Sequence, residues 1–229
     1  MTDRDTCDLS RCFLCRNCLP EWNGAIATEK QTLYFKKGRA IFREGEEVRG
    51  IYFVYDGAVK IHQYWGGDKD FIVRFATFGD VLGHRGQTHG TAFPVSATAL
   101  DHTRICFIRN EFLESTFKTN PSFLYAMMQL YAGELQRAES RMRSLAVMPV
   151  KGRVAEALFT IQEVFGLNAE GYISVPITRL DIACYAGTAY EAVFRLFTKW
   201  SGEGIVSTQG KYIRIIDEKK LREFIWYPE

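Results

Sequence analysis

The sequence predicts an α+β protein with an N-terminal β-roll of the jelly-roll type, a long helix and a C-terminal winged helix-turn-helix. Three patterns carry this prediction. Aromatic and β-branched runs separated by glycines fill residues 25–109, and such runs are typical of antiparallel strands. Apolar residues then recur every three or four positions over residues 121–145, as they do along one face of a helix. Two capping-box patterns lie close together after residue 177.

Length and composition restrict the class of protein. The chain has 229 residues and is 47% hydrophobic, enough for a real core and two domains. Its formal net charge of +2 is nearly neutral and indicates nothing about a nucleic-acid partner. The start MTDRDTCDLS lacks the layout of a signal peptide, and no run of about 18 apolar residues occurs. We therefore expect a cytoplasmic protein with no membrane partner.

Changes in residue pattern divide the chain into four segments. Pro149 ends the long helical pattern and marks a hinge or domain boundary. We expect a cysteine-rich segment for a metal or cluster at 1–24, the β-roll domain at 25–115, a dimerisation helix at 116–148 and the winged helix-turn-helix at 149–229.

Four cysteines fall within the twelve positions 7–18, and only Cys106 and Cys184 follow. Stable disulfides are rare in the cytoplasm, so this crowding predicts a metal site. The alternatives are an iron–sulfur cluster, a structural zinc held by all four N-terminal cysteines, and a thiol–disulfide switch that uses Cys106. Cys184 is expected to be a small core residue. One loop can offer three sulfurs to one cluster, from Cys12, Cys15 and Cys18.

The long helix carries an apolar seam with steps of four and three residues, held for about three heptads. A buried helix of a single chain can show such a stripe, but a strict period of 3.5 favours pairing with a second copy. The predicted dimer interface is made of Leu124, Met128, Tyr131, Leu135, Ala138, Met142 and Leu145.

The segment after residue 177 predicts two helices around one tight turn. Thr178 and Asp181 have the spacing of a capping box and would open the first helix. Gly187 would end it in a left-handed conformation. Thr188 and Glu191 repeat the capping spacing, so a second helix is expected there. Small and apolar side chains would pack the two helices together, namely Ile182, Ala183, Val193 and Leu196.

This layout is that of a helix-turn-helix, whose second helix enters the major groove of DNA. The stretch GIVSTQGKYIRII follows as strand, turn and strand, which predicts a wing. Residues 150–229 hold ten Lys or Arg and ten Asp or Glu, so DNA binding requires the cations to gather on one face. Without DNA, Glu191 would be only a helix cap and Arg195 only a solvated cation. The residues expected at DNA are Thr178, Thr188, Tyr190, Glu191, Phe194, Arg195, Lys199 and Lys211.

The order of β-roll, long helix and winged helix resembles the CRP/FNR family of bacterial transcription regulators. KKGRAIFREGEEVRGIYFVYDGAVKI and FGDVLG resemble that family's β-roll, and ITRLDIACYAGTAYEAVFRLFTKWSGEGIV resembles its DNA-reading module without a gap. The resemblance covers residues 33 to 216. It implies a homodimeric regulator that is not an enzyme, with an inverted-repeat DNA site and RNA polymerase as partners.

The resemblance also implies roles for single residues. Glu191 and Arg195 fall on the family's base-reading positions, where Arg195 would bind guanine O6 and N7 and Glu191 would accept from a cytosine amine. Phe194 departs from the FNR branch, which has a small hydroxyl residue there. Cys106, in TRICFIRNEFL, matches the isolated ligand cysteine of that branch. An oxygen-labile [4Fe–4S] cluster is therefore expected on Cys12, Cys15, Cys18 and Cys106, with Cys7 as a substitute for one of the first three.

The resemblance does not extend to the family's cyclic AMP site. Nucleotide sensors of the family place a Glu and then an Arg–Ser pair in the β-roll. His84 stands at the Glu position here, and Phe93 and Pro94 fall near the Arg–Ser positions. A cyclic phosphate needs a fixed cation or a nest of N–H donors, and proline removes a donor. We expect that cyclic AMP is not the effector.

Other functions stay open at this point. One is a CRP/FNR-type regulator with a structural zinc or thiol switch and a different effector in the β-roll. A β-roll module that acts through a protein partner is another. A redox or electron-transfer protein would use the cysteines alone, without the DNA module. No catalytic residues are predicted, because the four histidines are scattered and no paired catalytic carboxylates occur.

Overall fold

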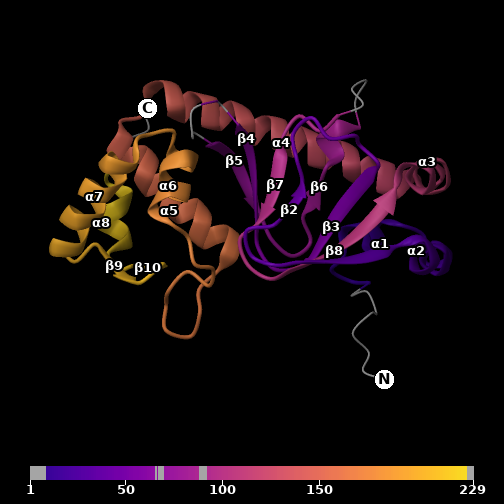
Figure 1. Cartoon of the computed structure of the whole chain (residues 1–229), viewed down its shortest axis with the longest axis horizontal. Coiled ribbons are helices and arrows are strands. Elements are labelled where there is room, and N and C mark those ends of the chain that lie inside the picture. The colour runs from indigo at the N-terminus through magenta and orange to yellow at the C-terminus, as the bar shows by residue number, and fades with distance from the viewer. Residues whose placement is uncertain (1–8, 65, 67–69, 88–91, 226–229) are drawn as a thin grey trace. The chain divides into compact units, whose positions relative to one another are not determined.

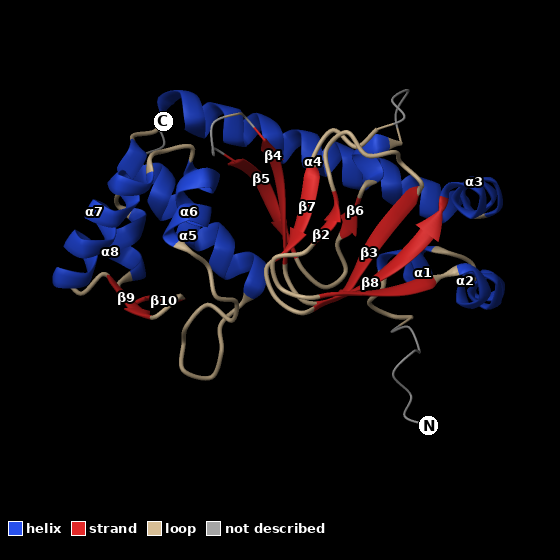
Figure 2. Ribbon diagram, viewed as in Figure 1, coloured by secondary structure: helices blue, strands red, loops and turns tan. Residues whose placement is uncertain are grey.

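The computed structural model describes residues 9–64, 66, 70–87 and 92–225. Figures 1 and 2 show the order of the helices and strands along the chain. The chain separates into two compact units, each described by itself. One unit is made of Met1–Ile61 with Ala76–Gln136, and the other of His62–Phe75 with Arg137–Glu229.

The β-type runs form strands as the glycine spacing predicts. They pair in two four-stranded sheets, in the orders β1-β8-β3-β6 and β2-β7-β4-β5. The pairs β1/β8, β3/β8 and β2/β7 are antiparallel. The predicted fold class is confirmed. The strands are β1 (Gln31–Phe35), β2 (Ala40–Phe42), β3 (Gly50–Asp56), β4 (Val59–Tyr64), β5 (Asp70–Ala76), β6 (Val81–Leu82), β7 (Ser96–Ala99) and β8 (Thr103–Arg109).

Stacked aromatic rings fill the roll beside the short 3-10 helix η2 (His84–Gly86). The Phe93 ring lies 4.1 Å from the Phe42 ring and 6.3 Å from the Tyr52 ring, between centroids. Gly83 precedes η2 with a φ of 79°, and a Cβ atom there would lie 3.1 Å from Phe93. The chain therefore passes these rings closely at a position where only glycine is unstrained.

The N-terminal segment is more helical than the sequence pattern predicts. It forms α1 (Phe13–Asn17), the 3-10 helix η1 (Pro20–Trp22) and α2 (Asn23–Glu29). The β-type pattern is expected from about residue 25, whereas residues 25–29 belong to α2 and the first strand begins at Gln31. α2 buries only Ile26, so seven residues contain no repeating apolar face from which a helix could be recognised.

The predicted long helix is confirmed as α4 (Pro121–Val147), which follows α3 (Asn110–Thr119). Pro121 occupies the first helical position, where its missing N–H is no loss. Pro149 lies beyond the end of α4 and precedes the first residue of α5 (Val150–Phe165). Among the described residues, no helix combines the length and apolar character needed to cross a membrane.

The second unit contains the predicted helix-turn-helix and wing. Its helices after α5 are α6 (Arg179–Ala186), α7 (Tyr190–Gly202) and α8 (Glu218–Arg222), and its hairpin is β9 (Val206–Gln209) with β10 (Tyr212–Ile215). Ile182, Val193, Phe197 and Trp200 are almost completely buried between the helices. This core holds α7 against α5 and α6 by one face only.

Candidate nucleic-acid interface and thiol cluster

The first helix of the helix-turn-helix begins and ends as predicted. The backbone N–H of Asp181 donates to Thr178 Oγ1 at 3.0 Å, and the Thr178 N–H donates to Asp181 Oδ2 at 3.2 Å, so the capping box is complete. Gly187 ends α6 with a φ of 60° and a ψ of 49°. A Cβ atom on Gly187 would lie 2.8 Å from Leu145 Cδ2. Both backbone conformation and close packing therefore favour glycine at this turn.

The second predicted capping box is wrong. α7 begins at Tyr190, its N-cap residue is Ala189, and no side chain caps it. The N–H of Thr188 donates instead to the Ala183 carbonyl at 3.1 Å, and the Gly187 N–H donates to the same oxygen. Thr188 therefore belongs to the turn that closes α6, which leaves the Glu191 carboxylate outside any cap.

α7 has one buried and one exposed face. Val193, Phe197 and Trp200 form the buried face, while the predicted packing residue Leu196 is only half-buried. Phe197 and Trp200 were not among the predicted core residues, although their spacing from Val193 by four and seven is a helical signal. The exposed face near the helix N-terminus carries Glu191, Phe194 and Arg195.

The remaining residues predicted at DNA are spread over the module. Tyr190 is exposed in the first turn of α7, and Lys211 is exposed next to the tip of the β9–β10 wing. Thr178 and Thr188 are half-buried in their turns. Lys199 lies in the last turn of α7, where its Nζ is 3.8 Å from Glu203 Oε1. The DNA contacts of all these residues stay predictions.

The predicted metal-binding cysteines lie in one apolar cluster, called here the thiol cluster. Cys12, Cys15 and Cys106 are buried in it, and Cys18 packs against it half-buried. Cys106 is held on β8, opposite Thr32 of β1 and Phe53 of β3. The cluster thus brings Cys106 together with three cysteines that lie 88 or more positions earlier in the sequence. Cys184, in α6, is half-buried, whereas a fully buried core residue was predicted there.

The thiol cluster has the donor chemistry for a thiolate-bound group but is not arranged around an ion. Burial, together with the nearby Cys12 thiol as a smaller cause, raises the pKa of the Cys18 thiol to about 12. Among the described residues, no three His, Cys, Asp or Glu side chains form a group that could hold a metal ion. Cys7 lies outside the described residues. Four thiols in one cluster fit a [4Fe–4S] cluster or zinc in kind.

The thiol cluster packs directly on the beginning of α4. Phe123 and Met127 of α4 are buried in the same core, and the Phe13 and Phe123 rings meet edge to face at 6.1 Å between centroids. Asn120 adds a polar tie, because its Oδ1 accepts from the Leu19 N–H at 2.8 Å and its Nδ2 donates to the Thr116 carbonyl. Asn120 is buried at a helix junction, and no sequence pattern indicates this role.

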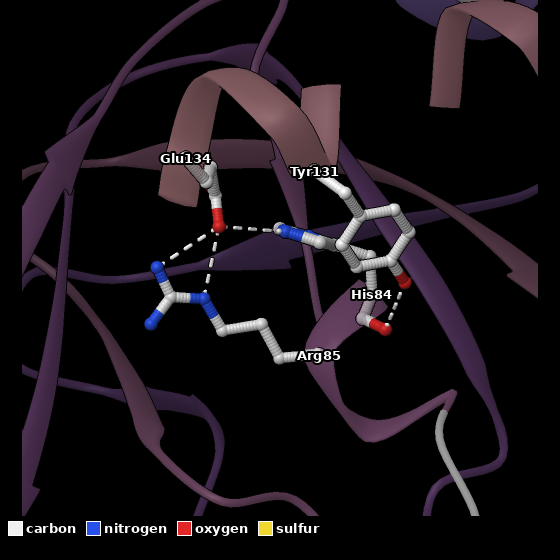
Figure 3. Close-up of polar contacts among 4 residues, drawn as sticks. All are labelled: His84, Arg85, Tyr131 and Glu134. Carbon is white, nitrogen blue, oxygen red and sulfur yellow. Dashed lines mark hydrogen bonds and ion pairs between the residues drawn. The ribbon is translucent and has the colours of Figure 1, made fainter. Parts of the chain in front are cut away.

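A second tie joins the β-roll to α4 around Glu134 (Figure 3). Glu134 is 7% exposed, and its Oε2 lies 3.0 Å from His84 Nε2 and 2.9 Å from Arg85 Nε. The Tyr131 hydroxyl donates to the His84 carbonyl at 2.6 Å. Both α4 residues, Tyr131 and Glu134, therefore hydrogen-bond to η2. Burial raises the pKa of the Tyr131 hydroxyl. The sequence related His84 only to the position of a Glu in the family's nucleotide site, and no pattern in it indicates Glu134 as the partner.

The predicted dimer seam lies largely on the surface of the described chain. Leu124, Met128, Leu135 and Met142 are each more than half exposed, and Tyr131 is 37% exposed. Ala138 is exposed as well, whereas Leu145 is half-buried and lies against Gly187. Leu145 therefore has a packing role inside its own chain. The rest of the seam leaves apolar side chains in water.

Comparisons with known proteins match both halves of this architecture. The model of the cyclic nucleotide-binding domain matches residues 32–120, and that of the Crp-like helix-turn-helix domain matches residues 152–224. The two matches together cover well over half of the chain. The chain belongs to the CRP/FNR family.

Relatives of this CRP/FNR protein are transcription regulators. The transcriptional activator protein Anr of Pseudomonas aeruginosa is 28% identical over 92% of this chain and 89% of its own. The fumarate and nitrate reduction regulatory protein of Escherichia coli is 26% identical over 82% and 76%. The structure of FixK2 from Bradyrhizobium japonicum superposes with a TM-score of 0.77, 24% identity and coverage of 87% and 99%. The two regulatory proteins support the FNR branch, and the FixK2 structure shows the same fold.

The CRP/FNR assignment decides between the classes of function left open by the sequence. The protein is a DNA-binding transcription regulator and not an enzyme. The electron-transfer alternative and the module without DNA binding are therefore set aside. The nature of the signal is a separate question.

Proposed function

We propose that this regulator acts as a homodimer on an inverted-repeat DNA site, with its DNA affinity set by an oxygen- or redox-sensitive [4Fe–4S] cluster. One observation carries the proposal. The first turns of α4 bury Phe123 and Met127 in the thiol cluster and expose Leu124 and Met128, the residues that directly follow them in the sequence. A change at the thiols therefore acts on the same few residues that present the seam.

Cys12, Cys15, Cys18 and Cys106 would hold the cluster, which supplies the sensitivity to oxygen when bound. Loading requires the N-terminal cysteines to turn toward Cys106, because the described side chains are not arranged around an ion. Cys12 and Cys15 lie at and within α1, whose Phe13 packs on Phe123. Reorienting α1 therefore repacks the beginning of α4. A ligand set completed only in one conformation shifts the population toward that conformation.

The exposed part of the seam supports the proposed dimer. Leu124, Met128, Leu135 and Met142 expose more than half of their surface along one helix, and a second copy is the partner with a matching 3.5-residue period. A two-fold dimer presents two copies of α7 to successive major-groove faces. The resemblance also implies RNA polymerase as a partner, and the sequence composition favours the cytoplasm as the location.

The β-roll interior argues against cyclic AMP as the effector. Phe93 stacks on Phe42 and Tyr52, so aromatic rings fill the region where the resemblance places the phosphate-binding pair. His84 is 1% exposed and engaged with Glu134. Saturable micromolar binding of cyclic AMP in calorimetry would contradict this part of the proposal.

A structural zinc on the four N-terminal cysteines, Cys7 included, is the second candidate. The burial of Cys106 in the thiol cluster favours the iron–sulfur assignment, because zinc bound by the N-terminal cysteines leaves Cys106 unused. A thiol–disulfide switch with Cys106 would need neither metal. Iron, sulfide and zinc analysis after anaerobic purification separates the three.

The deciding experiment compares Cys106→Ser with Cys184→Ser and Cys7→Ser, each reconstituted with iron and sulfide without oxygen. We expect Cys106→Ser to lose the visible absorbance of iron–sulfur charge transfer together with dimerisation and DNA affinity. Cys184→Ser, in α6, is the matched control and should keep the absorbance, and Cys7→Ser should keep most of it. A Cys106→Ser protein that still binds its metal would assign the site to zinc.

A further inference from the structure

Phe194 is an aromatic side chain on the exposed face of α7. It is 48% exposed, whereas Val193, Phe197 and Trp200 of the same helix are buried. Positions 191, 194, 195 and 198 follow the helical spacing of one face, so Phe194 lies beside Glu191 and Arg195. A single exposed apolar residue is ordinary on a protein surface. Phe194 differs because neighbouring side chains lie close to its ring.

Two neighbouring side chains, Arg179 and Tyr190, lie near the Phe194 ring. The guanidinium of Arg179, on α6, lies 5.6 Å from the Phe194 ring centroid and 5.4 Å from that of Phe197. The Tyr190 ring lies 6.3 Å away at an angle of 33°. The ring is therefore an ordered apolar surface, which loses little conformational freedom on binding.

We propose that Phe194 reads the C5-methyl group of a thymine in the major groove. The inference rests on the proposed entry of α7 into that groove. The thymine methyl is the one apolar group among the base edges there, and apolar side chains recognise it by contact. A phenyl ring cannot satisfy the donors and acceptors of guanine, cytosine or adenine, so covering their edges leaves polar groups without partners. Thymine is then favoured both by contact and by exclusion of the other bases.

The test uses thymine-to-uracil replacement, which removes the methyl group and leaves every hydrogen-bonding group of the base unchanged. Full-length protein reconstituted without oxygen first selects a half-site from a random duplex pool. Each thymine of that half-site is then replaced by uracil in turn, and the dissociation constant is measured by fluorescence anisotropy. We expect one position at which uracil weakens binding about fourfold, the weight of one buried methyl group.

The protein variants assign that loss to Phe194. Phe194→Ala should bind thymine and uracil duplexes equally at this position, while Leu167→Ala, an equally exposed apolar residue outside α7, should keep the fourfold preference. The proposal is overturned if no thymine shows the effect, or if Phe194→Ala keeps it. A protein that selects no sequence at all overturns the DNA-reading role of α7 as well. Arg195→Ala tests the DNA-reading role of α7 independently of Phe194. If α7 reads DNA, this variant should weaken binding to thymine and uracil duplexes alike.

Discussion

His84 Nε2 lies 3.0 Å from Glu134 Oε2, and this contact ties the β-roll to the long helix α4 (Figure 3). Glu134 adjoins Leu135 of the exposed seam, and Arg85 binds the same carboxylate oxygen. The tie therefore sets the position of α4 on the roll at the level of the seam.

Loss of the Glu134 carboxylate should weaken this tie. Glu134→Ala leaves buried His84 without its acceptor, so we expect a loss of about 1–3 kcal/mol in the free energy of unfolding. Urea denaturation measures it. A double-mutant cycle with His84→Ala should show a coupling of about 0.5–3 kcal/mol. Glu139→Ala, exposed on the same helix, is the control and should change stability little. Additive effects of the two substitutions would mean that the contact contributes nothing.

The seam should be essential for the dimer and dispensable for the fold. Leu135 is 61% exposed, so Leu135→Glu introduces a charge where little intrachain packing is lost. Two such charges facing each other in a dimer would be costly. We expect a folded monomer by light scattering and circular dichroism, with weakened DNA binding. Leu167→Glu, on an apolar residue outside α4, should stay dimeric. A dimeric Leu135→Glu protein would show that another surface pairs the subunits.

Two glycines of the second unit should respond to alanine with opposite signs. Gly187→Ala forces a Cβ into a left-handed backbone at 2.8 Å from Leu145, which should cost about 1–2 kcal/mol or more. Gly202 ends α7 without a positive φ, and a Cβ there meets nothing within 4 Å. Gly202→Ala should therefore stabilise by about 0.4–1 kcal/mol. Thermal unfolding of both variants measures the pair, and equal signs would contradict the turn geometry.

Asn120 should position the cysteine segment. Asn120→Ala removes the acceptor of the Leu19 N–H, the peptide group directly after Cys18. We expect a loss of about 1–3 kcal/mol and faster hydrogen exchange in residues 12–22. Asn110→Ala, at the start of α3, is a matched control that should leave this exchange unchanged. Unchanged exchange in Asn120→Ala would show that apolar packing alone holds the segment.

The Cys18 thiol should make the metal-free protein sensitive to alkali. Its folded pKa of about 12 lies above the ordinary value of 9.0, so the unfolded chain releases this proton first as pH rises. Stability is unaffected by this group below pH 9.0 and falls between 9.0 and about 12. Urea denaturation at increasing pH with a chelator measures the fall, which Cys18→Ala should reduce. Iodoacetamide should also label Cys18 slowly at pH 9, and rapid labelling would contradict the raised pKa.

Local sequence determined much of the second unit. Thr178, Asp181 and Gly187 carry their own hydrogen-bonding and backbone preferences, so the first helix and its turn could be located from neighbouring residues alone. The apolar period of α4 and the glycine turn of the wing are local in the same way. These features depend on contacts within a few positions.

Only the tertiary structure decided the features that join distant segments. Cys106 meets the N-terminal cysteines because β8 pairs with β1 and β3, and the spacing of residues does not specify that pairing. In the sequence, Glu134 is only one of the charged residues that flank the seam. The folded chain brings it into contact with His84, fifty residues earlier. In each case a contact between segments outweighs the local preference, and its energy exists only in the folded chain.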